Sequence, residues 1–558
     1  MRLTATSTGW CKTSTRVNRS HRSDALIIGG GHNGLVCAAY LAAAGLEVRV
    51  LERRSVAGGA AVTEEFHPGF RNSVASYTVS LLNPKVIRDL QLEVHGLRIV
   101  ERRLSNFLPT TDGRYLAVGA GRTQAEVAKF CTQDAQRLPA YSAQLERIAT
   151  ILRSLVLQTP PNLVAGSWRQ ALPELLRAAR LGRHVGKLDM PMRRELLRLL
   201  AISAGDYLEG WFESDPIKAV FGFDGIVGNY ASPYSPGTAY VLLHHVFGEV
   251  NGKSGVWGHA IGGMGAITQA MARVATARGT DIRLRAPVAR ILTDQDRVVG
   301  AVTENGEEFR AEAVISSLNP KLLYRQLMQD APLPDDFRQH IARWRCASGT
   351  FRMNVALTQL PDFRCLPGTQ LADHHTAGII IAPTLGYMER AYFDARSGGW
   401  SQQPIVEMLI PSTLDDTLAP AGQHVASLFC QHVAPRLPNG DSWDRHRDTV
   451  ADLMIRTVDQ YAPNFSASIV GRQIMSPLDL ERTFGLTDGD IFHGALSLDQ
   501  LFSARPMLGY GNYRGPLRGL YMCGSGTHPG GGVTGAPGHN AAQEILSDFR
   551  RGRLKRTS

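Results

Sequence analysis

The first clear pattern along the chain is a continuous apolar run at residues 24–28, followed by a glycine-rich turn. A run of this length predicts a parallel strand that is buried on both faces. Apolar residues recur three and four positions apart over 35–42, so we expect a helix there, with Gly45 at its C-terminal end. Residues 48–51 predict the next strand, and Glu52 ends it. The pattern is that of a strand-helix-strand unit.

Three glycines in the turn are spaced as Gly29-x-Gly31-x-x-Gly34. One glycine permits the tight turn, one lets backbone N–H groups reach a pyrophosphate, and one lets the helix pack against the strand. The phosphate charge then meets the positive end of the helix dipole. Glu52 lies 18 residues beyond Gly34, where a carboxylate can accept hydrogen bonds from both ribose hydroxyls of an adenosine. A 2′-phosphate would be repelled there, so the unit is expected to bind FAD or NAD but not NADP.

Four polar or charged side chains lie beside these residues. His32 and Asn33 occupy the variable positions of the glycine motif, where each can touch the cofactor or cap the helix. Arg53 and Arg54 directly follow the acidic residue, and a solvated role is favoured for both over a ligand-binding one. Arg53 stays among the candidate cofactor contacts.

Two later segments favour FAD over NAD. Gly58 and Gly59 extend bare backbone past the pyrophosphate, a second close approach that a plain nicotinamide fold does not need. Near the C-terminus we expect a strand at 520–523, an irregular glycine loop at 524–538 and a helix from Asn540 onward. A helix start aimed at a flavin ring would favour the negative charge that collects there on reduction.

Several motifs together resemble the FAD-dependent phytoene desaturase and amine oxidase superfamily. They are the N-terminal glycine motif, the glycine pair, "GTHPGGG", "GGMGAITQAMARVATARGTDIRLRAPVARIL" and "DIFHGALSLDQLFSARP". The resemblance covers nearly the whole chain. It implies an α/β fold in which a Rossmann-type FAD-binding domain (GR2-like) is interleaved with an α+β substrate domain. In this family the residue that matches Val288 contacts the adenine through its backbone.

Motifs and resemblance together give a set of candidate sites and a division of the chain. The candidate cofactor-binding residues are Gly29, Gly31, His32, Asn33, Gly34, Glu52, Arg53, Gly58, Gly59, Ala60, Val288, Gly524, Gly531, Gly532 and Val533. We expect a disordered or targeting segment at 1–23, FAD-binding segments at 24–104, 251–344 and 476–558, and substrate-domain segments at 105–250 and 345–475. The first substrate segment is expected to be mostly helical and the second richer in strands. A hairpin is expected around Asn305 and Gly306.

Composition and charge exclude several classes of protein. Hydrophobic residues make up 44% and charged residues 20% of the 558 residues, which is a globular profile. The net charge of +10 is spread along the chain without a recognition motif, so no nucleic-acid partner is expected. The seven cysteines form no C-x-x-C pair, so neither a metal site nor a thiol relay is indicated. A second βαβ fingerprint is missing too, so we expect a diffusible electron acceptor: oxygen, a quinone or an external carrier.

The first 23 residues are rich in Ser, Thr, Arg and Lys and contain no acidic residue. This is the composition of a mitochondrial transit peptide, and a bacterial chain with a disordered start would look the same. The expected compartment is therefore mitochondrial (matrix or inner-membrane face) for a eukaryotic chain and cytoplasmic for a bacterial one.

A basic stretch at 169–200 pairs leucines with arginines and a lysine. Such an amphipathic segment can lie on an anionic membrane and admit a lipid substrate. Pro173, Gly182, Gly186 and Pro191 are expected to interrupt it, which favours short helices with a solvated basic face. Peripheral membrane contact is kept as a hypothesis.

The resemblance implies an FAD-dependent oxidoreductase that removes hydride from an apolar, isoprenoid or lipid-like substrate. One alternative is a flavin amine oxidase, which would need an aromatic cage near the flavin. Another is a prenyl- or partner-binding protein of the Rab GDP-dissociation inhibitor type, which predicts a degraded flavin site. His67, His493, His528 and His539 are candidate bases near the cofactor segments, but none has an obvious partner in sequence, and no catalytic side chain is assigned.

Overall fold

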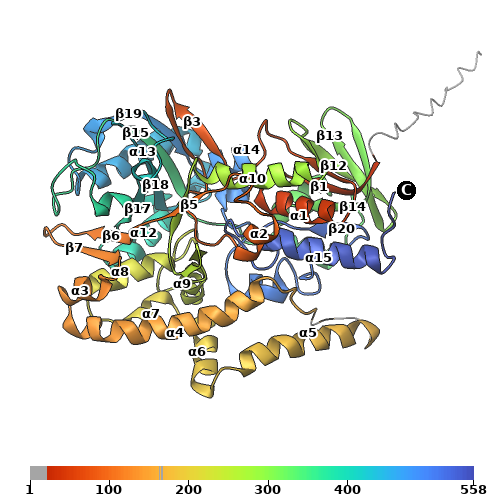
Figure 1. Cartoon of the computed structure of the whole chain (residues 1–558), viewed down its shortest axis with the longest axis horizontal. Helices are drawn as coiled ribbons and strands as arrows, with labels where there is room; N and C mark the ends of the chain where they lie inside the picture. The colour runs from red at the N-terminus through yellow and green to blue at the C-terminus, as the bar shows by residue number, and fades with distance from the viewer. Residues whose placement is uncertain (1–21, 163, 165–167, 558) are drawn as a thin grey trace, which may run out of the picture.

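The computed structural model of the protein describes residues 22–162, 164 and 168–557 (Figure 1). Most of the segment expected to be disordered or targeting therefore lies outside the described residues. The expectation is wrong for the last two residues of that segment. Arg22 and Ser23 pair with Arg310 and Ala311, so strand β1 covers Arg22–Ile28.

One seven-stranded sheet collects strands from both ends of the chain and from its middle. Its spatial order is β11 (Asp281–Arg283), β2 (Val48–Leu51), β1, β14 (Glu308–Ser316), β13 (Arg297–Thr303) and β12 (Val288–Asp294), with β20 (Leu520–Met522) also beside β14. Strands β11, β2, β1 and β14 run parallel to one another, and β20 runs parallel to β14. Strand β13 is antiparallel to both β14 and β12. The predicted hairpin is the β13–β14 turn around Asn305 and Gly306. This is the predicted Rossmann-type sheet with an antiparallel ribbon.

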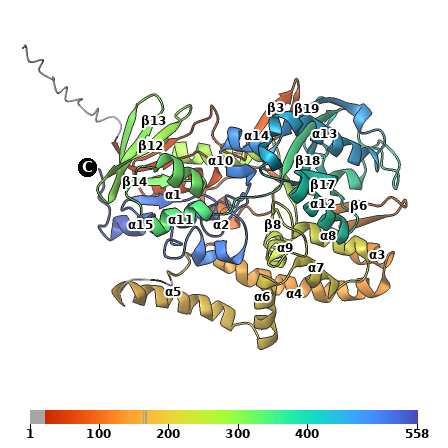
Figure 2. The same cartoon turned by 180° about the vertical axis from the view of Figure 1, so that it is seen from behind.

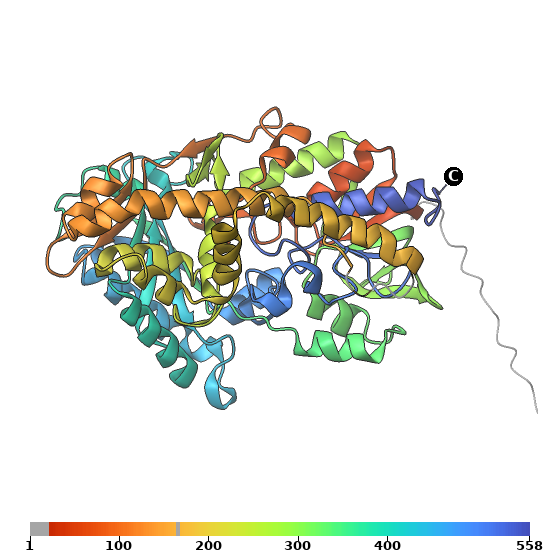
Figure 3. The ribbon, with the colours of Figure 1, turned by 90° about the horizontal axis from the view of Figure 1, so that it is seen from below.

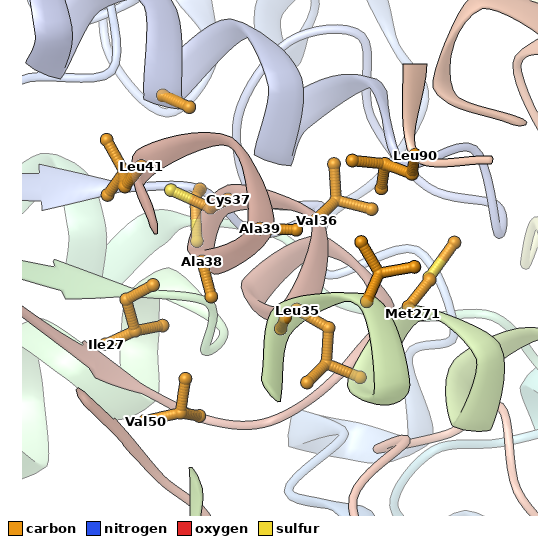
Figure 4. Packing of buried hydrophobic residues seen from close by; sticks show 14 of the residues in the cluster. Ile27, Leu35, Val36, Cys37, Ala38, Ala39, Leu41, Val50, Leu90 and Met271 are labelled. Atoms are coloured by element: carbon orange, nitrogen blue, oxygen red, sulfur yellow. The ribbon is translucent and has the colours of Figure 1, made fainter. Parts of the chain in front are cut away.

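Strand β1 is buried on both faces, as its apolar run predicts. Ala25 and Ile27 pack with helices α1 (His32–Ala43), α10 (Met264–Ala277) and α15 (Ala536–Arg550) on one face. Leu26 and Ile28 pack on the other face with the cluster that includes α11 (Asp335–Arg343), visible from behind in Figure 2. Figure 4 shows the small residues of α1, such as Ala38 and Ala39, between the sheet and its neighbours. Small side chains let the helix lie close to the strands.

The C-terminal helix begins earlier than expected. We predicted its start at Asn540, but α15 starts at Ala536, directly after Gly535, whose φ is +72°. Pro537 lies in the first turn, where a fixed φ and a missing N–H are well tolerated, so the helix can begin ahead of Asn540.

A second seven-stranded sheet organises the other half of the molecule. Its spatial order is β19 (Ile469–Met475), β15 (Phe351–Leu357), β18 (His424–Val433), β17 (Trp400–Leu409), β16 (Gly378–Ile381), β6 (Leu104–Pro109) and β7 (Tyr115–Gly119). Successive residues of β16 face opposite sides: Ile379 and Ile381 pack toward α13 (Trp443–Asp459), and Ile380 packs toward α12 (Leu385–Gly398). The β6–β7 hairpin belongs to this sheet, so the first substrate segment contributes strands as well as helices.

The remaining elements connect and cover these sheets. Helices α3 (Thr123–Ala128), α4 (Thr132–Val156), α5 (Trp168–Gly186), α6 (Met190–Ala201), α7 (Ala204–Glu209), α8 (Asp215–Asp224) and α9 (Thr238–Val246) form the helical part of the first substrate segment. The other elements include α2 (Pro84–Asp89), α14 (Pro477–Phe484), β3 (Thr63–His67), β4 (Phe70–Ser73), β5 (Ile99–Glu101), β8 (Glu249–Val250), β9 (Lys253–Ser254) and β10 (Gly258–Ala260). No helix in the described part of the chain is both long and apolar enough to cross a bilayer.

Two of the four expected interruptions in the basic stretch are wrong. Helix α5 runs through Pro173 and Gly182 without a break, and the chain leaves helical geometry only between Gly186 and Met190 (Figure 3). Pro173 lies within the first two turns of α5, where its missing N–H removes one intrahelical hydrogen bond at most. Pro191 lies in the first turn of α6, where proline is favoured.

Candidate functional site

One cavity of about 600 Å³ is lined by residues from both ends of the chain. Glu52 from the N-terminal unit and Gly532 from the C-terminal glycine loop both line it, although 480 positions separate them in the sequence. The two ends of the chain must converge in this way if they bind one elongated nucleotide. We call this space the central cavity.

Two glycine segments form a bare backbone wall of the central cavity. Gly58 N donates to Gly30 O at 2.8 Å, and Gly31 and Gly58 form an isolated parallel bridge. Gly59 has a φ of +57°, and a Cβ placed on it would lie 3.0 Å from the Cα of Gly31. Side chains are therefore excluded where the two segments meet. Backbone N–H groups at a helix start, with no side chains in front of them, form a surface that fits a pyrophosphate.

Glu52 ends β2 with its carboxylate fixed by two backbone donors. Gly30 N–H donates to Oε2 at 2.8 Å, and Arg54 N–H donates to Oε1 at 2.9 Å. The side chain is buried but lines the cavity. A carboxylate has about four acceptor sites, so both oxygens keep capacity for ribose hydroxyls. Arg53 also lines the cavity, and its Nη2 donates to Arg482 O at 3.1 Å.

Five buried polar atoms of cavity-lining residues have no partner among the described residues. They are Nε2 of His32, Oδ1 of Asn33, Nη1 of Arg54, Oγ of Ser80 and Nδ1 of His493. Native proteins rarely leave such atoms unpaired, so they indicate a polar ligand. The capping alternative for His32 and Asn33 is wrong, because the N-cap of α1 is Gly31 and no side chain caps it. The backbone wall, the fixed carboxylate and these unpaired atoms together fit FAD.

Most of the candidate cofactor residues lie on the cavity wall. The lining set contains Gly29, Gly31, His32, Asn33, Glu52, Arg53, Gly59, Ala60, Val288, Gly532 and Val533. Gly34, Gly58, Gly524 and Gly531 do not line it. A Cβ on Gly34 would lie 2.3 Å from Gly29 O, one on Gly524 2.2 Å from Ser317 O, and one on Gly531 2.1 Å from Phe492 Cδ1. These glycines allow segments behind the wall to pack closely.

Of the four candidate bases, His493 alone lines the central cavity. Burial lowers the pKa of His493 to about 3 and that of His32 to about 4, so both imidazoles are neutral near pH 7. His528 instead lies next to Leu155 O, 3.2 Å from its Nε2, and His539 Nδ1 lies 2.9 Å from Asn540 Oδ1. These two side chains have structural partners.

Another part of the cavity wall, which we call the far end, is built from residues that sequence reasoning missed. They come from separate segments and include Tyr77, Ser80, Leu81, Val227, His245, Trp257, Ile491 and Phe492. Most of them lie in loops or at helix ends, without a periodic pattern or a spacing motif. Ile491 and Phe492 lie in a motif that carries the family resemblance, and no sequence signal marked the other residues.

Tyr77 is held by a group of polar and charged side chains, which we call the Tyr77 cluster: Tyr77, Arg102, Asp224, Arg352 and Glu407. The Tyr77 hydroxyl donates to Glu407 Oε2 at 2.5 Å, and its ring stacks on Phe429 at 5.2 Å. The guanidinium of Arg352 lies 4.5 Å from the centre of the Tyr77 ring. Arg102 donates to the hydroxyl of the neighbouring Thr78. These contacts fix the aromatic ring that lines the cavity.

Asp224 adds a carboxyl group to this cluster. It lines a small void together with Tyr77, Arg102 and Glu407, and no described residue donates a hydrogen bond to its carboxyl. Burial, with a smaller contribution from the charge of Glu407, raises the pKa of Asp224 to about 8. Asp224 is therefore mostly protonated at neutral pH.

Comparison with known proteins gives one family and several relatives. A family model described as flavin containing amine oxidoreductase matches residues 34–351. The chain is 42% identical over 549 residues to pyridine nucleotide-disulfide oxidoreductase domain-containing protein 2 of Rattus norvegicus, with 94% of each protein covered. It is 24% identical over 526 residues to the lycopene-forming phytoene desaturase of Pantoea ananas, covering 92% of this chain and 96% of the relative.

A solved structure shares the fold. Wild-type putrescine oxidase bound to putrescine superposes with a TM-score of 0.57 at 17% identity, and the match covers 95% of this chain and 99% of the oxidase. At this identity the likeness concerns the fold.

Proposed function

The chain belongs to the flavin-containing amine oxidoreductase family, and from this premise we propose that it oxidises an apolar small molecule and passes the electrons to a diffusible acceptor. The family match confirms the resemblance drawn from the motifs, the FAD cofactor and the oxidoreductase class. The substrate and the acceptor are the proposed part. The observation that carries the substrate proposal is the composition of the far end of the cavity.

We propose one orientation for FAD in the central cavity. We assign its adenosine to Glu52 and Val288, its pyrophosphate to the backbone of Gly31 and Gly59, and its isoalloxazine to the loop at Gly532. FAD, when bound, supplies the chemistry that accepts hydride from the substrate. The residues of this chain bind and orient that group and exclude water from it.

The far end of the cavity supports an apolar substrate. Val227, Trp257, Ile491 and Phe492 all line it, so a substrate there would lie mainly against carbon. Burial lowers the pKa of His245, in this wall, and the pKa of His493, next to Phe492 in sequence, so neither imidazole brings a charge at pH 7. The name of the phytoene desaturase relative specifies phytoene, a hydrocarbon, which agrees with such a lining.

Flavin amine oxidation is the second candidate, because Tyr77 and Trp257 give the far end two aromatic walls. Aromatic faces can hold an amine. The charges behind Tyr77 favour the apolar substrate: Arg102 and Arg352 bring two guanidinium groups against the single carboxylate of Glu407, with Asp224 protonated. A protonated amine would meet a wall without net negative charge.

A diffusible acceptor is proposed because the described residues form no thiol relay. The six cysteines in the described residues are all free. Burial raises the pKa of Cys523, of Cys430 and of Cys346, so these thiols stay protonated and are poor nucleophiles. Electrons would then leave by oxygen, a quinone or an external carrier.

Anaerobic bleaching of the flavin tests the substrate class. The purified holoprotein is mixed with a polyene hydrocarbon, a long-chain lipid or an alkyl amine, and absorbance near ~450 nm is followed. We expect bleaching by an apolar compound and none by amines. Bleaching by amines alone would support the second candidate, and a colourless protein that takes up no FAD would overturn the flavin assignment.

A matched pair of variants links the bleaching to the far end. Ile491→Thr places a hydroxyl in the cavity wall, whereas Val470→Thr makes a similar change at an exposed site on β19. We expect Ile491→Thr to slow bleaching by about tenfold, because an unpaired hydroxyl disfavours an apolar substrate. The control variant should bleach at the wild-type rate.

A further inference from the structure

Helix α5 stands apart from the two sheets and runs along one edge of the molecule (Figures 1 and 3). Few contacts tie it down. Arg177 pairs with Glu544 of α15 at 3.1 Å, and Glu174 accepts a hydrogen bond from Asn162 N at 2.8 Å. Leu181 and Val185 face the body and are partly buried. The face of α5 opposite these two residues is therefore left without protein cover.

That open face is apolar. Leu172, Leu175 and Leu176 are 55%, 64% and 57% exposed, and their spacing of three and four residues places them on one side of the helix. On the neighbouring helix α6, Met190 and Leu197 are 56% and 67% exposed. Single exposed leucines are common, but three on one side of a helix indicate an interaction surface.

Cations border the same face. Arg180 and Arg183 follow Leu176 by four and seven residues, so they continue its side of the helix, and Lys187 follows directly after the helix ends. None of the three forms an ion pair with a described residue. With Arg177 they also reach the wall of a second cavity of about 610 Å³, so they lie where the open face borders the body. Unpaired cations beside exposed leucines are the arrangement of helices that bind at a membrane interface.

We propose that α5 and the start of α6 rest on an anionic lipid surface, with the leucines among the acyl chains and Arg180, Arg183 and Lys187 at the headgroups. Apolar burial and attraction to anionic lipid act together in such binding. A hydrophilic polyanion would use the cations but would gain nothing from the leucines. The inference concerns attachment to a surface and stands independently of the proposed substrate.

Co-sedimentation of the full-length holoprotein with vesicles tests the proposal. Vesicles of phosphatidylcholine with phosphatidylserine should carry the protein down, and vesicles of pure phosphatidylcholine should bind it weakly. Arg180→Glu/Arg183→Glu should lower the bound fraction on anionic vesicles at least about tenfold. Arg390→Glu/Arg396→Glu changes the net charge equally on the exposed side of α12 and should bind like the wild type.

A second pair of variants tests the leucines. Leu172→Ser/Leu176→Ser should weaken vesicle binding by about tenfold or more, whereas Leu371→Ser/Leu498→Ser, at similarly exposed positions elsewhere, should not. All four side chains are exposed, so each variant should retain FAD and its unfolding midpoint. The proposal fails if the wild type stays in the supernatant with anionic vesicles. It also fails if charge reversal on α5 and on α12 have equal effects, or if the leucine changes on α5 leave binding intact.

Discussion

The two ends of the central cavity are built by different means. At the nucleotide end, Gly31, Gly59 and the backbone around Glu52 present main-chain groups within a short stretch of sequence. At the far end, side chains such as Tyr77 and Trp257 come from segments that only the tertiary fold brings together. Backbone recognition suits a cofactor whose shape is fixed, and side-chain recognition allows the substrate to differ between relatives that share a fold.

The largest expected effect concerns the backbone wall. Gly31→Val places a side chain where the pyrophosphate is assigned, although a Cβ at Gly31 meets only Gly59 Cα, at 3.9 Å. The fold should therefore survive, while FAD affinity falls at least about a thousandfold, or about 4 kcal/mol. Flavin titration of the apoprotein and its circular dichroism spectrum measure the two effects. Gly386→Val, on α12, is the control and should bind FAD normally.

If Gly31→Val kept its flavin, FAD binding would not depend on an open backbone at Gly31. The contrast between a backbone-built nucleotide end and a side-chain-built far end would then be wrong. Loss of both flavin and secondary structure would be uninformative about binding, so the apoprotein is compared with wild-type apoprotein at the same temperature. Equal helical content in the two apoproteins, with unequal FAD affinity, is the expected outcome.

The second prediction concerns pH and the far end. The folded-state pKa of Asp224 is raised to about 8 from 3.8, so between these values the folded protein holds a proton that the unfolded chain has released. The free energy of unfolding must then fall as pH rises through this window. Asp224→Asn cannot titrate, so it should gain about 3 kcal/mol over wild type between pH 5 and pH 7. Urea unfolding at each pH, with saturating FAD, measures the difference; parallel profiles would contradict it.

The third prediction returns to the nucleotide end. Glu52→Gln keeps the length of the side chain but removes the charge that strengthens hydrogen bonds from the ribose and from the N–H groups of Gly30 and Arg54. We expect FAD affinity to fall about thirtyfold, near 2 kcal/mol, with the overall fold retained. Isothermal titration of the apoprotein gives the value. Wild-type affinity in this variant would remove Glu52 from the cofactor site.

The sequence was most informative where the chemistry depends on neighbours along the chain. The β1–α1–β2 unit and its glycine spacing were predicted closely, because buried strands and tight turns leave local patterns. Prediction was poorer for helix boundaries near proline. Pro173 was expected to interrupt a helix but lies inside α5, and α15 starts at Ala536, ahead of the predicted Asn540. Pairing of Tyr77 with Glu407 left no trace in the sequence, because 330 positions separate the two residues.

The fourth prediction separates stability from cofactor binding at the far end. Tyr77→Phe removes the hydroxyl that donates to buried Glu407, so the free energy of unfolding should fall by about 1 kcal/mol. FAD affinity should change less than about twofold, because Tyr77 lies at the far end of the cavity and not among the residues assigned to the nucleotide. The control is Tyr141→Phe, which removes a buried hydroxyl that donates no hydrogen bond to a described residue and should cost less. A large loss of FAD affinity in Tyr77→Phe would mean that Tyr77 also contributes to cofactor binding, and the two ends could not be treated as separate sites.

The smallest expected effect tests how far the nucleotide end depends on side chains at all. Arg53 lines the cavity, but its guanidinium donates to Arg482 O, so the structure gives it a partner outside the ligand. Arg53→Ala should therefore change FAD affinity less than about threefold, well below the effect expected for Glu52→Gln one position earlier. Both affinities are measured in one titration series at fixed salt. Equal losses in the two variants would mean that the cation contributes to binding as much as the carboxylate, and the description of this end as a backbone site would need a second charged contact.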